Sequence, residues 1–154
     1  MSSSIRDTLQ AALRADSGLC IIRETFAGIA GSSEGLEDEF GSDRVRTLPI
    51  ADRAAVGTAV GMGIAGKRVI VELSSSGRLA AIAEALTEAA SIAATGEVPI
   101  GLVVRLPYGG QAGNQIDRAA GDLLSAIPNL HVVCPSTPAA ACGLLTAAVK
   151  ARKP

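Results

Sequence analysis

The sequence predicts a three-layer α/β/α domain built on a mostly parallel sheet. Short apolar segments alternate with longer helical segments along the chain, as in consecutive βαβ units. The apolar segments show no polar alternation, which is typical of strands that are covered on both faces. At 154 residues, the chain has the length of one domain and can bury a core without disulfides or metals.

The first third of the chain predicts two helices and two strands. Ser4 begins a helix that runs to Ala15, because its hydroxyl can cap the helix and Asp7 follows three residues later. The apolar run Leu19–Ile22 is expected to be a strand, followed by a glycine- and serine-rich loop at Ala27–Gly35. The next elements are a short acidic helix, Glu34–Phe40, and a short strand, Val45–Leu48.

The rest of the chain alternates helix and strand more regularly. The last helix has a clear start, because Thr137 can cap it and Pro138 takes its first position. The expected helices are Arg53–Ile64, Leu79–Ala94, Asp117–Ile127 and Pro138–Lys150. The expected strands are Arg68–Leu73, Ile100–Arg105 and His131–Cys134, with a loop at Pro107–Asn114.

Composition and charge exclude several classes of partner. A net charge of −1 and the lack of a Lys/Arg cluster argue against nucleic acid and anionic membranes. The N-terminus has no apolar core of a signal peptide, and the apolar run Ala54–Gly66 is too short to span a bilayer. Cys20, Cys134 and Cys142 lie far apart in apolar runs, so we expect buried, reduced thiols in a cytoplasmic protein that holds no metal.

The core must be built mainly from small aliphatic side chains. Hydrophobic residues make up 48% of the chain, whereas aromatic residues make up only 2%. Gly57, Gly61 and Gly63 are expected to let helices approach closely. The helix Arg53–Ile64 is apolar on nearly every face, so we expect an oligomer in which another subunit covers it.

Asp52 is the leading candidate for a functional residue. It lies between the apolar edge Leu48–Ile50 and a helix of small residues, a position suited to holding a cofactor ring away from water. The alternative is that Asp52 is only a helix N-terminal acid, stabilised by the helix dipole. The residues alone leave both interpretations open.

Other candidates follow the ends of predicted strands, where α/β sheets place their ligands. They are Glu24, the polar stretch Ser74–Gly77, and the loop Pro107–Gly110 with the only tyrosine, Tyr108. The stretch Ser74–Gly77 is equally explained as an ordinary polar loop, and Glu24 as an exposed residue. Because His131 is expected inside the fold, no nucleophile–histidine–acid set can be assembled.

Gly61–Gly66 matches the pattern GxGxxG but not its required context. A dinucleotide site needs the glycines after a strand and before a helix, whereas here they close a helix and precede a strand. The chain also has no GxxxxGK[ST] motif and no GDG-type phosphate and metal motif. An acid suited to a cofactor ring, without a phosphate site, suggests half of an active site.

Several motifs together resemble one known family. Those motifs are Phe40–Val45 (FGxxRV), Thr47–Gly57 (TPIAEAGIVG), Ala59–Glu72 (AIGMAxxGLRPVxE), Arg105–Gly109 (RxPxG) and Asn129–Leu145 (GLKVVxPSTPxDAKGLL). The chain resembles the pyrimidine-binding domain of thiamin-diphosphate enzymes of the transketolase type. Its nearest resemblance is to the β subunit of the 2-oxoacid dehydrogenase E1 component.

The resemblance implies the thiamin-diphosphate-binding fold of the pyrimidine type and one half of a shared site. A separate E1 α-like subunit would bind the diphosphate and Mg²⁺, and the two would form an α2β2-type assembly. Together they would transfer a two-carbon acyl or ketol unit, with an acyl-carrier or lipoyl domain as a possible acceptor. The alternative is a non-catalytic structural or regulatory homologue that only pairs with a partner. A self-contained nucleotide-binding domain has little support.

The resemblance also assigns the site. Asp52 takes the position of the family's glutamate, which hydrogen-bonds to N1′ of the aminopyrimidine and so activates the cofactor. The cofactor-binding residues expected are Glu24, Ile50, Asp52, Ser74, Ser75, Ser76 and Arg78. The family's aromatic residues are replaced around Ser74–Arg78, and Ile116 stands where a histidine is expected. The sequence ends at Pro154, so we expect one domain over residues 1–154, without the family's C-terminal domain.

Overall fold

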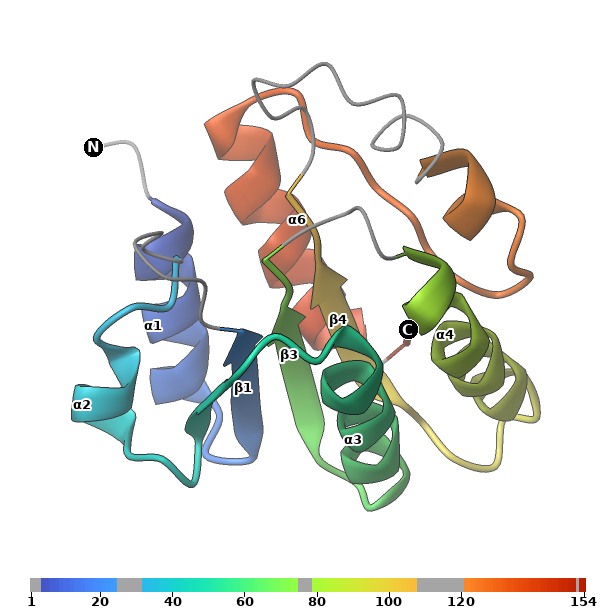
Figure 1. Cartoon of the computed structure of the whole chain (residues 1–154). Helices are drawn as coiled ribbons and strands as arrows, with labels where there is room; N and C mark the ends of the chain where they lie inside the picture. The colour runs from blue at the N-terminus through green and yellow to red at the C-terminus, as the bar shows by residue number, and fades with distance from the viewer. Residues whose placement is uncertain (1–3, 25–31, 75–78, 108–120, 152) are drawn as a thin grey trace.

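A four-stranded parallel sheet with the strand order β2-β1-β3-β4 forms the centre of the computed structural model (Figure 1). The structure describes residues 4–24, 32–74, 79–107, 121–151 and 153–154. The strands are β1 (Leu19–Glu24), β2 (Val45–Leu48), β3 (Arg68–Glu72) and β4 (Gly101–Arg105). The helices are α1 (Ile5–Ala15), α2 (Leu36–Phe40), α3 (Asp52–Ile64), α4 (Leu79–Ala94) and α6 (Pro138–Ala151), and residues 121–125 are also helical.

Helices cover both faces of the sheet, and each face has its own apolar cluster (Figure 1). Ile22 and Val71 point toward α3 and α4, whereas their neighbours Ile21 and Ile70 point toward α1 and α6. Successive strand residues face opposite sides, so both sets must be apolar when both sides are covered. This arrangement explains the continuous apolar strands in the sequence and confirms the predicted three-layer class.

The helices that follow β1 and β3 in the sequence lie on opposite faces of the sheet. After β1 the chain reaches α2, whose Leu36 packs in the cluster under α1. After β3 the chain reaches α4, which packs in the other cluster through Ile82 and Leu86. Since β1 and β3 are neighbours, the carboxyl ends of these two strands form the topological switch point of the sheet. Ligands of open α/β sheets bind at such points.

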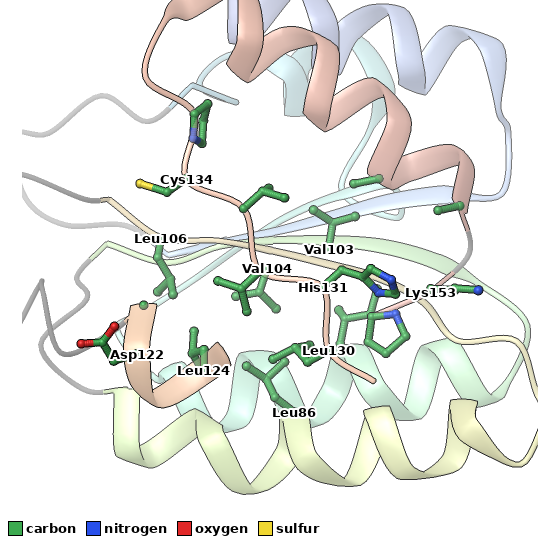
Figure 2. Close-up of a pocket in the computed structure, with 18 of the residues that line it drawn as sticks. Leu86, Val103, Val104, Leu106, Asp122, Leu124, Leu130, His131, Cys134 and Lys153 are labelled. Carbon is green, nitrogen blue, oxygen red and sulfur yellow. The ribbon is translucent and has the colours of Figure 1, made fainter. Parts of the chain in front are cut away.

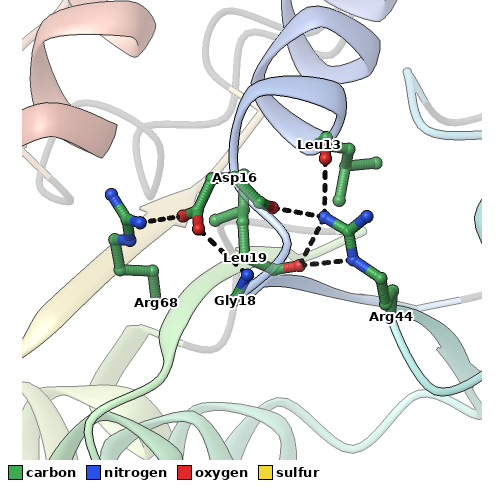
Figure 3. Close-up of polar contacts among 6 residues, drawn as sticks. All are labelled: Leu13, Asp16, Gly18, Leu19, Arg44 and Arg68. Atoms are coloured by element: carbon green, nitrogen blue, oxygen red, sulfur yellow. Dashed lines mark hydrogen bonds and ion pairs between the residues drawn. The ribbon is translucent and has the colours of Figure 1, made fainter.

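A cluster of polar contacts stabilises the other end of the sheet, where β1 and β3 begin (Figure 3). The Arg44 guanidinium donates to the carbonyls of Leu13 (2.7 Å), Asp16 (2.5 Å) and Leu19 (3.2 Å), which joins the end of α1 to the start of β1. The Asp16 carboxylate pairs with Arg68 at 2.5 Å and accepts from an amide in the following turn. These contacts stabilise the amino ends of the strands, which lie away from the switch point.

Most predicted elements are confirmed, including the capping box of α1 formed by Ser4 and Asp7. Leu79–Ala94 has the predicted bounds, and Thr137 accepts from the amide of Ala140 at the start of α6. The predicted helix Asp117–Ile127 is helical at residues 121–125, while its first residues lie outside the described part. The loop Pro107–Asn114 also lies mostly outside it.

The predicted strand His131–Cys134 is wrong. The segment is extended but joins no strand of the described sheet, and the amide of His131 donates to the carbonyl of Pro154 instead. A strand forms only where a neighbouring strand supplies its backbone hydrogen bonds. The apolar side chains of this segment do not ensure that such a neighbour is present. His131 and Cys134 are therefore exposed rather than buried, and Val133 is 57% exposed. Cys20 is buried as predicted, and Cys142 is half-buried.

The prediction that the α3 glycines let helices approach each other closely is wrong, because the close approach found at these three positions is to Ile100, which precedes β4 and lies in no helix. A Cβ at Gly63 would lie 2.9 Å from Cγ2 of Ile100, so this glycine permits a close approach. A Cβ at Gly57 or Gly61 would meet nothing within 4 Å, because both lie on the open side of α3. No helix among the described residues is long and apolar enough to cross a membrane.

Candidate functional site

The Glu24 carboxylate joins three segments at the switch point. Glu24 ends β1, is 8% exposed, and lies on the face covered by α3. Its Oε1 accepts from the amide of Ala51 at 2.9 Å, at the start of α3. Its Oε2 accepts from the amide (3.1 Å) and the hydroxyl (2.9 Å) of Ser74, which follows β3. One buried carboxylate therefore connects the ends of β1 and β3 with the beginning of α3.

Asp52 is the first residue of α3 and directly follows the amide that Glu24 holds. Its side chain is only 4% exposed, so the carboxylate lies inside the fold at the carboxyl edge of the sheet. The exposed amides at a helix N-terminus favour a negative charge there. Two buried acids, Glu24 and Asp52, thus lie beside the switch point. Such a place suits a polar ring that must be oriented away from bulk water.

The structure brings together part of the predicted site. Glu24, Asp52 and Ser74 converge at the switch point, as the sequence led us to expect for strand-end residues. Ile50 lies next to them but is 40% exposed, so its side chain borders the site from the outside. The remaining predicted residues lie outside the described part: Ser75, Ser76, Arg78, Tyr108 and Ile116.

The other face of the sheet carries a polar cluster that the sequence did not reveal. Glu72, which is buried, accepts from the guanidinium of Arg105 and from the hydroxyl of Ser33, and Arg105 also donates to Ser32 at 3.1 Å. Burial lowers the pKa of the Arg105 guanidinium, and the Glu72 carboxylate beside it supplies the opposite charge. Arg23, Glu72 and Arg105 are direct partners across β1, β3 and β4. The sequence signal that could have predicted this cluster is a charged residue near the end of each of the apolar strands β1, β3 and β4.

A cavity of about 560 Å³ lies along the outer edge of β4 (Figure 2). Its walls come from β4, α4, α6, the helical residues 121–125, residues 130–135 and residues 153–154. The lining is mainly aliphatic, with Asp122 and Cys134 toward one end and His131 and Lys153 toward the other (Figure 2). None of the residues that converge at the switch point lines it. The residues of the predicted strand His131–Cys134 line this cavity.

Within the described ranges, no group of three or more His, Cys, Asp or Glu side chains could hold a metal ion. The buried acids at the switch point are acceptors, which suit a hydrogen-bond donor on a ring and repel a phosphate. The geometry therefore fits the organic part of a cofactor better than its anionic part.

Comparison with known families gives a match over the whole chain. A family model described as "Transketolase, pyrimidine binding domain" matches residues 1–154. The chain belongs to this family. The resemblance drawn from the sequence motifs is thus confirmed, and the parallel sheet with helices on both faces is consistent with the family's pyrimidine-type fold.

Three relatives illustrate the match of this pyrimidine-binding domain. The pyruvate dehydrogenase E1 component subunit beta of Acholeplasma laidlawii is 36% identical over 155 residues, which cover 95% of this chain and 47% of that protein. The protein of the same name from Leifsonia xyli subsp. xyli is 31% identical over 162 residues, covering 100% of this chain and 48% of its own length. The 2-oxoisovalerate dehydrogenase subunit beta of Pseudomonas aeruginosa is 30% identical over 161 residues, covering 97% and 45%. The chain therefore spans about half the length of these relatives.

Proposed function

We propose that this pyrimidine-binding domain is one half of a split thiamin-diphosphate enzyme that transfers a two-carbon acyl or ketol unit. The observation that carries the proposal is the buried carboxylate of Asp52, at the first position of α3 beside the switch point. The family match and the named E1 beta relatives support the same cofactor class. Bound thiamin diphosphate would supply the carbon nucleophile for the transfer.

The described residues fit the aminopyrimidine part of this cofactor. Asp52, with 4% of its side chain exposed, would accept a hydrogen bond from the protonated ring nitrogen N1′ in a water-poor setting. Glu24 and Ser74 would border the ring, with Ile50 at the rim; Ser75, Ser76 and Arg78, which follow in the sequence, are also proposed to contact the cofactor. An aspartate is one methylene shorter than the family's glutamate, so the position of the ring relative to α3 decides whether Asp52 forms a direct hydrogen bond to N1′.

The diphosphate and its Mg²⁺ belong, in this proposal, to a separate E1 α-like subunit. The absence of a three-ligand metal cluster among the described residues is compatible with that division. The open side of α3 favours a subunit contact, because Gly57 and Gly61 leave space for a close approach and Ile64 is 47% exposed. We therefore propose an α2β2-type assembly, with an acyl-carrier or lipoyl domain as acceptor. We also propose a cytoplasmic location, because the three cysteines are free thiols in the structure.

Substitution of Asp52 tests the proposal in the assembled enzyme. Asp52→Ala should lower turnover by at least about a hundredfold, since the acid–base contribution at N1′ would be lost. Asp52→Glu should retain or raise turnover by restoring the longer reach. Asp52→Asn keeps the size of the side chain and serves as the matched control for packing. A fully active Asp52→Ala enzyme with a lowered melting temperature would identify Asp52 as a helix N-terminal acid only.

Cofactor binding distinguishes the proposed enzyme from a non-catalytic homologue. The isolated chain should bind thiamin diphosphate negligibly, and the chain with its α-like partner should bind it in a magnesium-dependent way. Calorimetry with and without the partner measures both. Micromolar binding by the isolated chain contradicts the proposed division of the site. Assembly with the partner, without any cofactor binding, supports the structural homologue instead.

A further inference from the structure

We infer that Glu24 is a positioning residue for Asp52: its carboxylate holds the start of α3 and the end of β3 in one fixed relation. This inference rests on the proposed function, because Asp52 needs an exact orientation only if it meets the cofactor. Glu24 acts through main-chain groups and is not assigned any proton transfer.

Each carboxylate oxygen of Glu24 accepts a hydrogen bond from a backbone amide. Oε1 accepts from the Ala51 amide at 2.9 Å, and Oε2 accepts from the Ser74 amide at 3.1 Å. The partners are 27 and 50 residues away in sequence, so the carboxylate joins segments that have no local connection to β1. Hydrogen bonds to an ionised acceptor are roughly twice as strong as neutral ones, and burial protects them from competing water.

The amide of Ala51, the N-cap residue of α3, takes its acceptor from outside the helix. In a capping box, the side chain three residues later accepts from this amide, but that residue is Ala54, which has no acceptor. Ala51 is bonded directly to Asp52, so any movement of the Ala51 amide turns the first residue of the helix. Ser74 follows the end of β3, and Glu24 therefore sets the relation of Asp52 to the carboxyl end of that strand.

A glutamine tests this role, because it has nearly the same shape but only one acceptor oxygen. In Glu24→Gln, the Nε2 donor must face one of the two backbone donors, so one of the bonds is lost. Amide hydrogen exchange on the isolated full chain should show at least about a tenfold loss of protection at Ala51, at Ser74 or at both. The amide of Ile70, inside the sheet, should keep its protection. Unchanged exchange at both Ala51 and Ser74 would overturn the inference.

Turnover of the assembled enzyme tests whether the hydrogen bonds of Glu24 to Ala51 and Ser74, here called the Glu24 clamp, act through Asp52. Glu24→Gln should lower kcat by about tenfold to a hundredfold, the effect expected from a small displacement of a reacting group. In an Asp52→Asn background, the same change should alter kcat by less than about twofold, because the group to be positioned is already removed. Additive losses in this double-mutant cycle would overturn the positioning role. A simple loss of stability would produce additive losses.

Two further variants separate the clamp from general effects of substitution. Ser74→Ala removes the hydroxyl donor but keeps the amide donor, so it should give a smaller loss of kcat than Glu24→Gln and remains informative if Glu24→Gln folds poorly. Glu97→Gln changes an exposed glutamate in the loop before β4 and should alter neither exchange nor kcat. If the wild-type assembly shows no activity, the proposed function fails, and the exchange measurements alone decide whether Glu24 is a clamp.

Discussion

The two glycines near the end of α3 give a matched test of how this helix packs. A Cβ added at Gly63 would lie 2.9 Å from Cγ2 of Ile100, a fully buried side chain, whereas a Cβ at Gly61 meets nothing within 4 Å. Carbon atoms pack at about 3.5–4.0 Å, so Ile100 must move by about 0.6–1.1 Å to accept Gly63→Ala. Overpacking of this kind costs about 1–3 kcal/mol.

The gain in helix propensity is similar for both substitutions. Replacing glycine by alanine in a helix stabilises it by about 0.8–1.0 kcal/mol. Gly61→Ala should therefore stabilise the isolated chain by up to about 1 kcal/mol. Gly63→Ala should leave its stability unchanged or lower it by up to about 2 kcal/mol. The difference between the two variants, about 1–3 kcal/mol, isolates the contact with Ile100.

Urea or thermal unfolding of the isolated chain measures this difference. For a chain of this size, each kcal/mol corresponds to about 2–4 °C in melting temperature. Equal stability of Gly61→Ala and Gly63→Ala would refute the close packing of α3 against Ile100. If the open side of α3 is a subunit interface, Gly61→Ala should also weaken assembly while it stabilises the free chain. Unchanged assembly would place the interface elsewhere.

Two further predictions concern the edges of the fold. Ser4→Ala should destabilise the chain by about 0.5–2 kcal/mol in urea unfolding, because the Asp7 amide loses its capping acceptor at 3.1 Å. The hydrogen bond from the Ser4 backbone lowers the pKa of the Asp7 carboxyl in the folded chain. The stabilisation of the fold by ionised Asp7 is therefore complete above the unfolded-state pKa and is lost as the pH falls through the lowered folded-state pKa. Asp7→Asn should remove this dependence of stability on acid pH. Arg44→Ala should cost about 1.5–3 kcal/mol, because carbonyls that bind a charged donor lose it, while the exposed Arg46→Ala should cost less than about 0.5 kcal/mol. Equal effects of the two arginine variants would contradict the structural role of Arg44.

Helices and their caps could be predicted well because a helix contains its own hydrogen bonds. The capping box of Ser4 and Asp7, and the bounds of Leu79–Ala94, depend on neighbours within a few residues. The strands in the core were also predictable, because apolar residues on both sides of a strand require cover on both faces. The sequence motifs around Asp52 were specific enough to identify the family.

Contacts between distant segments could not be predicted from the sequence alone. The acceptor role of Glu24 depends on donors 27 and 50 residues away, and the sequence offered it only as a residue after a strand and, through the family resemblance, as a cofactor-binding residue. Gly61 and Gly63 look alike in sequence, but only the packing of α3 decides which one faces Ile100. His131–Cys134 has the composition of a strand without the pairing of one, since the hydrogen bonds of a strand come from its neighbour. Local interactions therefore fixed the elements of this domain, and the packing of distant residues decided its candidate site.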